Sequence, residues 1–512
     1  MKYYLGDVQV CQCLVLFMFV SHLSLTDGRH KRVIVVGGGI AGLAAARKIS
    51  NCKTCDIHVT VFEARRDRYG GRIWTDKKHM PHARGIEAEL GGSTINMQVK
   101  NNPLSNLTRD FELETSKFGE SIFVMPDGKT YRGKDLADVY VKAIDIVASA
   151  VHRVRSNQKD VSMREAITRW VEEEEGELDM DGPVGLFLRT LPSFSVGSYS
   201  ALLYRPSDLD FGYEQVVLDG MSEVLDRLVS GSGPESPLEI ELRMTVRQIE
   251  LKPASRIVLV RTKDREQFEA DAVIVAVPLS VIRKEKLVFE PALSKDYRYA
   301  LDQVGISSGN KLIVEFDEVF WPEDVGVFVL APATEADEGF LQVWLNSHKL
   351  GGTKSLTGMM FGPAADRFEN MTDEEVETKA RQQLSKLFGV KKVEARNVTQ
   401  ILRSDWSKNI YTGGASSFPQ VGNNPTIWDT LSKPICPLVF FAGEHTILEG
   451  IGTMHGAYQS GLRAAEQFLS GYCDKHSKHK DKHKQKPAPS DGDKQTLNKN
   501  KANERDKKKD EL

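Results

Sequence analysis

Residues 32–49 read RVIVVGGGIAGLAAARKI, and this stretch decides how the rest of the chain is interpreted. Four apolar residues that favour β-structure, Val33 to Val36, run directly into glycines and then into a segment rich in Ala and Leu. This order predicts a buried parallel strand, a tight turn and a helix. The fold class we expect is therefore α/β.

The glycines of this turn stand in the spacing G-x-G-x-x-G, at Gly37, Gly39 and Gly42. The first permits the turn, the second lets the backbone approach a pyrophosphate, and the third lets the helix pack close to the strand. A second predicted strand, 57–62, ends at Glu63, about 20 residues after the last glycine, where a carboxylate accepts from a ribose hydroxyl. The pattern indicates a dinucleotide with a free 2′-hydroxyl, which leaves FAD and NAD as candidates.

Composition limits the remaining possibilities. The chain has 512 residues, of which 40% are hydrophobic and 27% charged, as in ordinary globular proteins of about two to four domains. A net charge of −3 gives no basic footprint, so we expect no nucleic-acid partner. Cys52 and Cys55 form a C-x-x-C without a second pair at ligand spacing, so we expect thiols that are free or clasp the loop, and no metal.

Both ends of the sequence carry targeting patterns. Residues 1–25 contain one early lysine and the apolar run CQCLVLFMFV (11–20), which predicts a signal peptide and is too short to span a membrane; a buried strand of a cytosolic protein is the alternative. Residues 474–512 have almost no apolar content and predict a disordered basic tail, which ends in KDEL (509–512). We therefore expect the lumen of the endoplasmic reticulum, with the KDEL receptor as a partner and secretion as the alternative. The three N-x-S/T sequons, at Asn106, Asn370 and Asn397, would be glycosylation acceptors there.

The middle of the chain changes character several times. Apolar residues recur at helical spacing in 135–155 and 163–175, which predicts a mainly helical insertion. Strands are expected again at 257–261 and 270–282, then at 307–316, 339–345 and 356–361, with a helix over 373–387. A strand, a glycine loop and a helix over 438–469 close the folded part.

Four stretches together carry a family resemblance: RVIVVGGGIAGLAAARKI (32–49), VFEARRDRYGGRI (61–73), ADAVIVAVPLSVI (270–282) and FAGEHT…GTMHGAYQSGLRAA (441–465). On these motifs the sequence resembles the FAD-dependent amine oxidases, and within them the polyamine oxidases, over roughly residues 31–470. The resemblance implies FAD rather than NAD. It also implies a Rossmann-like FAD-binding domain of the GR2 type, discontinuous over 31–105, 216–300 and 420–470, with an α+β substrate-binding domain over 106–215 and 301–419.

The same resemblance assigns site residues. It implies that the cofactor is held by Gly37, Gly39, Gly42, Glu63, Arg65, Gly71, Arg72, Val246, Trp406, Gly443, Glu444, Thr453 and Met454. It implies substrate contacts at Asn96, Tyr411, Thr453 and His455, and a lysine, Lys311, that is hydrogen-bonded through a water to flavin N5. Monoamine oxidases attach flavin to a cysteine in Y-S-G-G-C, whereas residues 411–415 here read YTGGA, so the expected FAD is non-covalent.

Physical chemistry also singles out Lys311. It lies in the apolar strand NKLIV, where burial of a lysine is costly unless its pKa shifts or it finds a partner. The alternative is a lysine at a strand edge whose amine reaches solvent.

The segment expected near the amine departs from the family. Polyamine oxidases place Glu or His in G-A-x-W-x-(E/H)-G, whereas residues 91–96 read GGSTIN. Asn96 can accept a hydrogen bond from an amine but cannot offset its charge. Either other acids, such as Glu87 or Glu89, neutralise the substrate, or the substrate is less cationic than spermine.

We therefore expect an amine oxidase that uses O2 and releases H2O2, with polyamines as substrates. One alternative is an L-amino-acid oxidase, in which Arg205 or Arg403 would pair with the substrate carboxylate. A second alternative is a catalytically silent flavin-binding protein of the secretory pathway, which the non-family stretch STIN favours.

Overall fold

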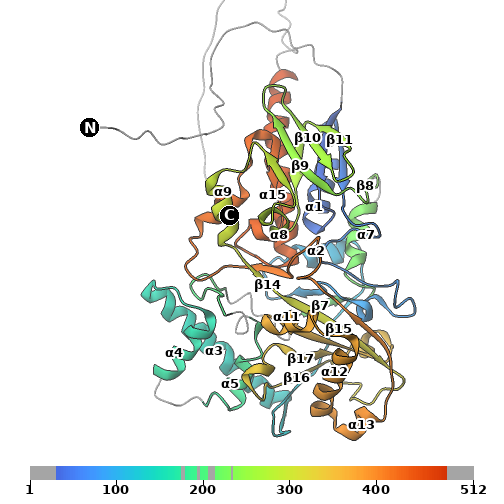
Figure 1. Cartoon of the computed structure of the whole chain (residues 1–512), viewed down its shortest axis with the longest axis vertical. Helices are drawn as coiled ribbons and strands as arrows, with labels where there is room; N and C mark the ends of the chain where they lie inside the picture. Colours follow the sequence, from blue (N-terminus) through green and yellow to red (C-terminus); the bar gives the residue numbers. More distant parts are fainter. Residues whose placement is uncertain (1–29, 174–178, 193–196, 206–213, 232–234, 481–512) are drawn as a thin grey trace, which may run out of the picture.

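The computed structural model describes residues 30–173, 179–192, 197–205, 214–231 and 235–480, with side chains to residue 472. The predicted signal peptide and the KDEL sequence lie outside these residues. The molecule has an upper part around α1 and α15 and a lower part around α3 and α12 (Figure 1).

A five-stranded parallel sheet forms the centre of the upper part, in the order β21-β12-β1-β2-β8. Its strands come from widely separated stretches of chain: β1 (Lys31–Val36), β2 (Ile57–Phe62), β8 (Glu239–Glu241), β12 (Ala272–Val275) and β21 (Val439–Phe441). Val36 pairs with both Phe62 and Val275, so three strands end at the same level. The residues that follow these strands therefore share one edge of the sheet, where ligands bind in open α/β folds.

The alternation of side chains along β1 explains how the two faces of this sheet are covered. Val33 and Val35 pack in one core with α1 (Ile40–Ser50), α7 (Ser222–Ser230) and α15 (Met454–Lys480). Ile34 and Val36 point to the opposite face and join a second core with the four-stranded sheet β11-β10-β9-β13. Residues Val33 to Val36 of β1 are all apolar because both faces are buried there. That second layer contains β9 (Val246–Lys252), β10 (Ile257–Thr262), β11 (Gln267–Ala270), β13 (Val288–Glu290), α8 (Leu279–Arg283), α9 (Lys295–Gln303) and α14 (Thr426–Ser432).

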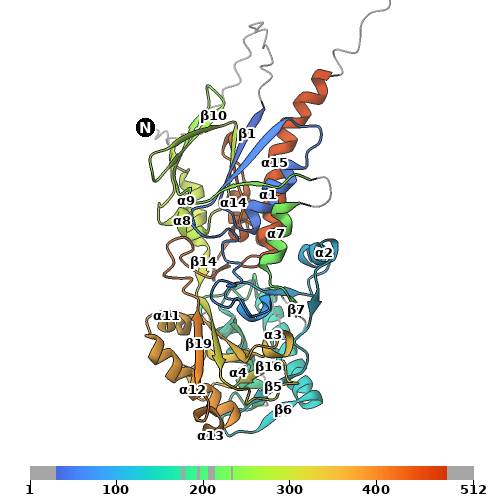
Figure 2. The ribbon, with the colours of Figure 1, turned by 90° about the vertical axis from the view of Figure 1, so that its right-hand side faces the viewer.

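The lower part is built on a seven-stranded sheet in the order β19-β15-β18-β17-β16-β5-β6 (Figure 2). Its strands are β5 (Ser121–Val124), β6 (Thr130–Arg132), β15 (Gly309–Phe316), β16 (Val327–Leu330), β17 (Phe340–Leu345), β18 (Ser355–Phe361) and β19 (Val398–Arg403). One core joins this sheet to α11 (Pro363–Glu369), α12 (Asp373–Phe388) and α13 (Val390–Glu394). Another joins it to α3 (Gly133–Asn157), α4 (Met163–Glu173) and α5 (Pro183–Leu188).

Short elements connect the two parts. A three-stranded sheet contains β3 (Thr94–Asn96), β4 (Thr115–Ser116) and β7 (Glu214–Val217), and a two-stranded one contains β14 (Gly305–Ser307) and β20 (Ser416–Phe418). The remaining helical segments are α2 (Pro103–Asp110), α10 (His348–Gly351), η1 (Gly85–Ala88), η3 (Glu335–Asp337), η4 (Cys436–Leu438) and η5 (Glu444–Thr446).

Several sequence predictions are confirmed and three are corrected. The helices expected over 135–155, 163–175 and 373–387 are present as α3, α4 and α12. The insertion is less helical than expected, because β5 and β6 leave it to join the seven-stranded sheet. The tail predicted to be disordered from residue 474 begins as helix, since α15 continues to Lys480. Cys52 and Cys55 are joined by a disulfide, which clasps the loop between α1 and β2 and excludes free thiols there.

None of the helices in the described ranges combines the length and the apolar character needed to cross a membrane.

Candidate functional site

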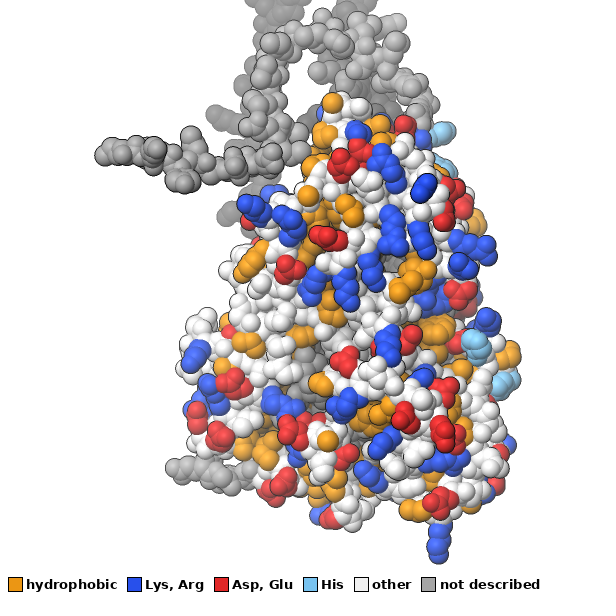
Figure 3. Space-filling view, viewed as in Figure 1, with side chains coloured by type: hydrophobic (Ala, Val, Ile, Leu, Met, Phe, Trp, Pro, Cys, Tyr) orange, Lys and Arg blue, Asp and Glu red, His pale blue; other side chains and the backbone are white. Residues whose placement is uncertain are grey.

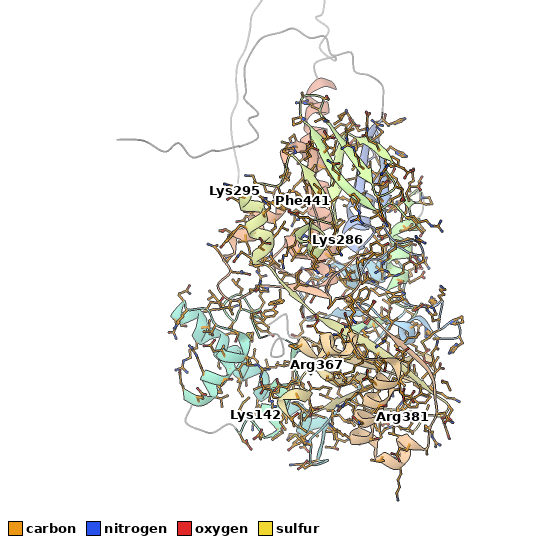
Figure 4. The ribbon with its side chains drawn as sticks, viewed as in Figure 1. Lys142, Lys286, Lys295, Arg367, Arg381 and Phe441 are labelled. Atoms are coloured by element: carbon orange, nitrogen blue, oxygen red, sulfur yellow. A yellow bond between two sulfur atoms is a disulfide. The ribbon has the colours of Figure 1, made fainter. Side chains whose placement is uncertain are left out.

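A cavity of about 610 Å³ lies where the strands β1, β2 and β12 end, and it extends between the two parts of the molecule. Lys286, labelled in Figure 4, is one of its lining residues. The cavity also receives residues of β15 and β18 from the seven-stranded sheet, among them Lys311 and Met359. The ends of parallel strands thus form one wall, and the second sheet closes the other.

The glycine turn after β1 has a distinct geometry at each position. Gly37 has a φ of +110°, and a Cβ there would lie 2.8 Å from the carbonyl oxygen of Ala276. A Cβ on Gly42 would lie 2.0 Å from the carbonyl oxygen of Gly37, so only glycine lets α1 pack this close to the turn. A Cβ on Gly39 would have no neighbour within 4 Å, because this residue faces the cavity. The backbone at Gly39 is therefore open to a ligand at the N-terminus of α1, as a pyrophosphate requires.

Glu63 lies beside this turn at the end of β2 and is 6% exposed. Its carboxylate accepts from the backbone N–H of Gly38 at 2.9 Å and from that of Arg65 at 2.8 Å. The guanidinium of Arg65 lies over the ring of Tyr411, with 5.4 Å between its Cζ atom and the ring centroid. Val246, at the start of β9, lines the same end of the cavity. These contacts fix a carboxylate and a cation near the open glycine.

An ion pair with a buried carboxylate joins the turn at Gly70 and Gly71 to the last motif of the chain. Arg72 donates to Glu444 at 2.8 Å and to the carbonyl oxygen of Ala415 at 2.9 Å. Glu444 also accepts from Ser417 at 3.1 Å and from the backbone N–H of Gly452 at 3.0 Å. Burial alone would raise the pKa of Glu444, but Arg72 and the other donors outweigh it and lower the pKa. Glu444 is therefore kept ionised beside Arg72.

The turns on either side of this pair are also tight. Gly71 has a φ of +61°, and its Cβ position is 3.3 Å from Cα of Gly39. Gly443 has a φ of +125°. At the start of α15, the hydroxyl of Thr453 accepts from the N–H of Gly456 at 3.0 Å, and Met454 lies against Gly92.

Lys311 projects from β15 into the other half of the cavity. It is 8% exposed, so the alternative of an amine that reaches solvent is wrong. Its Nζ donates to the hydroxyl of Ser93 at 2.6 Å. Burial lowers the pKa of Lys311 to about 8, while Glu89 opposes this shift. A lysine with this pKa holds or releases a proton near neutral pH.

Trp406 lines the cavity near Lys311 and is held from two sides. Its indole Nε1 donates to the carbonyl oxygen of Leu90 at 3.2 Å, and its backbone N–H donates to the side-chain oxygen of Asn310 at 3.2 Å. The ring meets Trp74 edge-on, with 6.1 Å between centroids. A large aromatic face is thus fixed in position beside the lysine.

The predicted site residues are brought together with three exceptions. All the predicted cofactor residues line the cavity except Gly42, and of the predicted substrate residues Tyr411 and Thr453 do so. Asn96 lies outside the lining, and its side-chain oxygen accepts from the N–H groups of Gln98 and Val99 to close a turn. His455 also lies outside the lining, next to Gly450.

The other charged residues considered from the sequence have structural partners. Glu87 accepts from Thr353 and from the backbone N–H of Arg84, and Glu89 is buried behind the cavity wall. Arg205 pairs with Glu449, and Arg403 pairs with Asp373. None of these four residues lines the cavity. Neither Arg205 nor Arg403 is therefore placed to bind the carboxylate of an amino-acid substrate, as an L-amino-acid oxidase would require.

Sequence reasoning missed several lining residues. Ser93 accepts a hydrogen bond from the amine of Lys311. Met359 lies beside Lys311 because these two residues are paired across β18 and β15. Phe361 lies two residues further along β18 on the same face. The motif Gly-Gly-Ser could have drawn attention to Ser93, but Met359 and Phe361 depend on a strand register that no local signal contains.

The arrangement fits an elongated, anionic flavin nucleotide. The lining charges within the described residues are the cations of Arg65, Arg72, Arg247, Lys286 and Lys311 and the carboxylates of Glu63 and Glu444. Lys and Arg side chains also gather over the upper part of the face in Figure 3. This positive excess suits a pyrophosphate, the open glycine suits its close approach, and the Trp406 half suits an aromatic ring. Over the described part of the chain, no group of His, Cys, Asp or Glu is arranged to hold a metal ion.

Comparison with known proteins gives a consistent result. A family model described as flavin containing amine oxidoreductase matches residues 40–469. Polyamine oxidase 2 of Arabidopsis thaliana is 29% identical over 457 residues, which are 86% of this chain and 88% of that protein. Lysine-specific histone demethylase 2 of Homo sapiens is 28% identical over 468 residues, 88% of this chain and 55% of that protein. The solved structure of wild-type putrescine oxidase bound to putrescine has the same fold, with a TM-score of 0.67 and 22% identity. The match covers 86% of this chain and 99% of that one.

Proposed function

The chain belongs to the flavin-containing amine oxidoreductase family, and we propose that it is an FAD-dependent oxidase of polyamines. Its substrates would be spermine, spermidine or their acetylated forms, and its products an imine that hydrolyses to an aldehyde and an amine, with H2O2 from O2. The observation that carries this proposal is the buried Lys311 on Ser93 beside Trp406, in the same cavity as the open glycine turn. The similarity to plant polyamine oxidases supports the choice of substrate.

When bound, the flavin would supply the hydride acceptor and the route by which electrons reach O2. The chain supplies binding, orientation and proton control. The turn at Gly39 and the Arg72–Glu444 pair would hold the cofactor, while Trp406, Met359 and Phe361 would exclude water from the reacting end. Lys311, held by Ser93, keeps a proton at a fixed atom near that end and would assist reoxidation or hydrolysis.

The experiment that tests this proposal is anaerobic bleaching of the flavin in the visible band. The substrates to compare are spermine, spermidine, N1-acetylspermine and a panel of L-amino acids. Bleaching by a polyamine with none by amino acids is the expected result. Bleaching by leucine or phenylalanine alone would establish the amino-acid oxidase instead, and a yellow protein that no amine bleaches would point to a silent flavin-binding protein.

We also propose that the cofactor is FAD, bound non-covalently in a Rossmann-like domain of the GR2 type. Ala415 stands where a cysteine would attach the flavin, and no cysteine is found in the described lining of the cavity. Acid precipitation should therefore release all the yellow colour into the supernatant. Phosphodiesterase treatment of the released cofactor should yield AMP and FMN; colour that stays in the pellet would contradict the proposal.

The site of action that we propose is the lumen of the endoplasmic reticulum, with secretion as the alternative. The support is the KDEL sequence, the signal-like segment 1–25 and the sequons. Removal of residues 509–512 from the protein expressed in mammalian cells should move it from the cell lysate to the medium. A protein that stays cytosolic in both forms would contradict this localisation.

A further inference from the structure

Glu89 is a buried carboxylate behind the wall of the cavity. It lies between η1 and β3 and is 2% exposed. Its Oε1 accepts from the hydroxyl of Thr75 at 2.8 Å and from the backbone N–H of Met221 at 2.5 Å. Its Oε2 is also buried but has no hydrogen-bond partner among the described residues. A carboxylate with one unmatched oxygen in the interior needs a compensating charge or a proton.

Lys311, in the same wall, is a buried cation that needs a compensating negative charge. A protonated lysine has three N–H hydrogens, and within the described parts of the chain Nζ of Lys311 donates to one acceptor, Ser93, four residues after Glu89. The hydroxyl of Ser93 is neutral and cannot offset the positive charge. The segment that contains Glu89 packs directly on the strand of Lys311, because Leu90 and Ile313 belong to one buried cluster.

The charged groups around Lys311 leave Glu89 as its electrostatic partner. Burial lowers the pKa of Lys311, and Glu89 is the charged group that opposes this change. Burial raises the pKa of Glu89, with Lys311 as the first group that opposes it and Lys77 as the last. On β19, Arg403 is directed to Asp373 and the carbonyl oxygen of Met371.

We propose that Glu89 is the buried counter-charge of Lys311 and sets the pH at which this lysine releases its proton. Glu89 is thus a positioning residue, since it does not line the cavity and acts through Lys311. The catalytic meaning of this role rests on the proposed oxidase function, whereas the electrostatic pairing does not. Lys311 keeps its proton to higher pH when Glu89 is ionised and releases it at lower pH when the carboxylate is absent.

The test measures the protonation of Lys311 directly in the purified, flavin-bound protein. Trace labelling with acetic anhydride is carried out across pH 6 to 10, and the acetylated Lys311 peptide is quantified by mass spectrometry against the other lysines. Lys311 lines the cavity, through which a small reagent would approach it. The wild-type midpoint is expected near the pKa of about 8. In Glu89→Gln the midpoint should fall by about one pH unit, the effect of losing a nearby opposite charge.

Two matched variants separate charge from structure. Glu87→Gln removes another buried carboxylate two residues away, one that binds Thr353 and the N–H of Arg84, and should leave the Lys311 midpoint unchanged. Glu89→Asp keeps the charge and should restore most of the wild-type midpoint. If Glu89→Gln does not fold, Thr75→Val replaces it as the test. The Thr75 hydroxyl donates a hydrogen bond that stabilises ionised Glu89, so its loss should lower the Lys311 midpoint by a smaller amount.

An unchanged Lys311 midpoint in a folded Glu89→Gln protein, or in Thr75→Val where the first variant is lost, overturns the proposal. An equal fall in Glu87→Gln overturns it as well, because the effect would then be general. The labelling does not depend on turnover. A protein that oxidises no amine but shows the shift of the Lys311 midpoint would refute the proposed function and support the pairing. A protein that oxidises polyamines without the shift would support the function and refute the pairing.

Discussion

Burial of Lys311 lowers the stability of the folded protein, although the proposed reaction needs this residue. A pKa lowered from 10.5 to about 8 corresponds to a destabilisation of roughly 3 kcal/mol, at about 1.4 kcal/mol per unit. This penalty is fully present below pH 8, where the buried amine is charged, and it is relieved as the pH rises from 8 to 10.5. In that window the unfolded chain binds more protons than the folded one, so stability increases with pH.

Replacement of Lys311 by methionine should therefore raise the melting temperature at pH 7 while it lowers turnover by about 10²-fold or more, the usual effect of losing a proton-transfer group. The gain in melting temperature should shrink between pH 8 and 10.5. Thermal melts across this range check the prediction, with Lys263→Met on the exposed surface as the control. A Met variant that is less stable at pH 7 would show that the contact to Ser93 outweighs the burial of the charge.

The pH dependence of catalysis should reflect the same group. If neutral Lys311 accepts a proton during turnover, kcat should rise through a midpoint near the pKa of about 8 and then reach a plateau. The midpoint should disappear in Lys311→Met. Stopped-flow measurements of anaerobic flavin reduction and of reoxidation, each against pH, would identify the step that carries it. A midpoint that persists in the Met variant would assign it to the substrate amine.

At the scale of elements, two glycines at the junction of β1 and α1 have different roles, one in ligand binding and one in packing. Gly39 has φ −76° and ψ 171°, which any residue adopts, and a Cβ there meets no neighbour. A Cβ on Gly42 would clash with the carbonyl oxygen of Gly37 at 2.0 Å. Gly39→Ala should thus fold normally but lose flavin, because the methyl group occupies the space of the phosphates. Gly42→Ala should destabilise the protein by several kcal/mol, of the order of an overpacked core. Melting temperature and the ratio of flavin to protein absorbance distinguish the two outcomes; equal stability in both variants would contradict them.

A polar network joins α11, β15 and the loop after β19 behind Trp406. Asn310 donates to Glu369 at 2.8 Å and accepts from Ser404 at 3.0 Å and from the N–H of Trp406. Asn310→Ala should destabilise the protein by about 1–3 kcal/mol, because several buried groups lose their partner. It should also change Trp406 fluorescence and lower kcat, whereas Asn424→Ala, an exposed asparagine that binds Thr426, should not. Unchanged fluorescence in Asn310→Ala would show that Leu90 alone holds the ring.

At the same scale, periodicity explains which elements could be predicted. The helix at Asp373–Phe388 carries its own signals, a Thr372 cap and apolar residues at helical spacing. The strands β5 and β6 carry no such periodicity: they pair with each other as a hairpin, and Ser121–Val124 pairs on its other side with β16, far along the chain. Short strands depend on pairing, and the pairing with β16 is not encoded locally.

At the scale of the whole molecule, the fold leaves all three sequons at the surface. Asn106, Asn370 and Asn397 are exposed. The amides of Asn370 and Asn397 each donate one hydrogen bond, to the carbonyl oxygen of Asp366 at 2.9 Å and to Asp317 at 2.8 Å. In a protein that enters the secretory pathway, glycans are therefore expected at all three sites. Deglycosylation in heavy-oxygen water followed by peptide mass spectrometry checks this, and three unmodified sites would count against the proposed localisation.

The sequence by itself determined the cofactor half of the site. Gly37, Gly39, Gly42 and Glu63 lie within one short strand-turn-helix-strand segment, so their spacing alone specifies their relation. For Lys311 the sequence left two possibilities, burial or an amine that reaches solvent, and the structure decided for burial.

The tertiary structure alone decided what surrounds the reacting end. Ser93 meets Lys311 across 218 positions of the chain, and Trp406 meets Leu90 across 316. The sequence placed Asn96 at the substrate, but its side chain is used to close a local turn. The physical reason is that a backbone turn needs neighbours in sequence, whereas a cavity between two sheets is shaped by registers and packing that join distant segments.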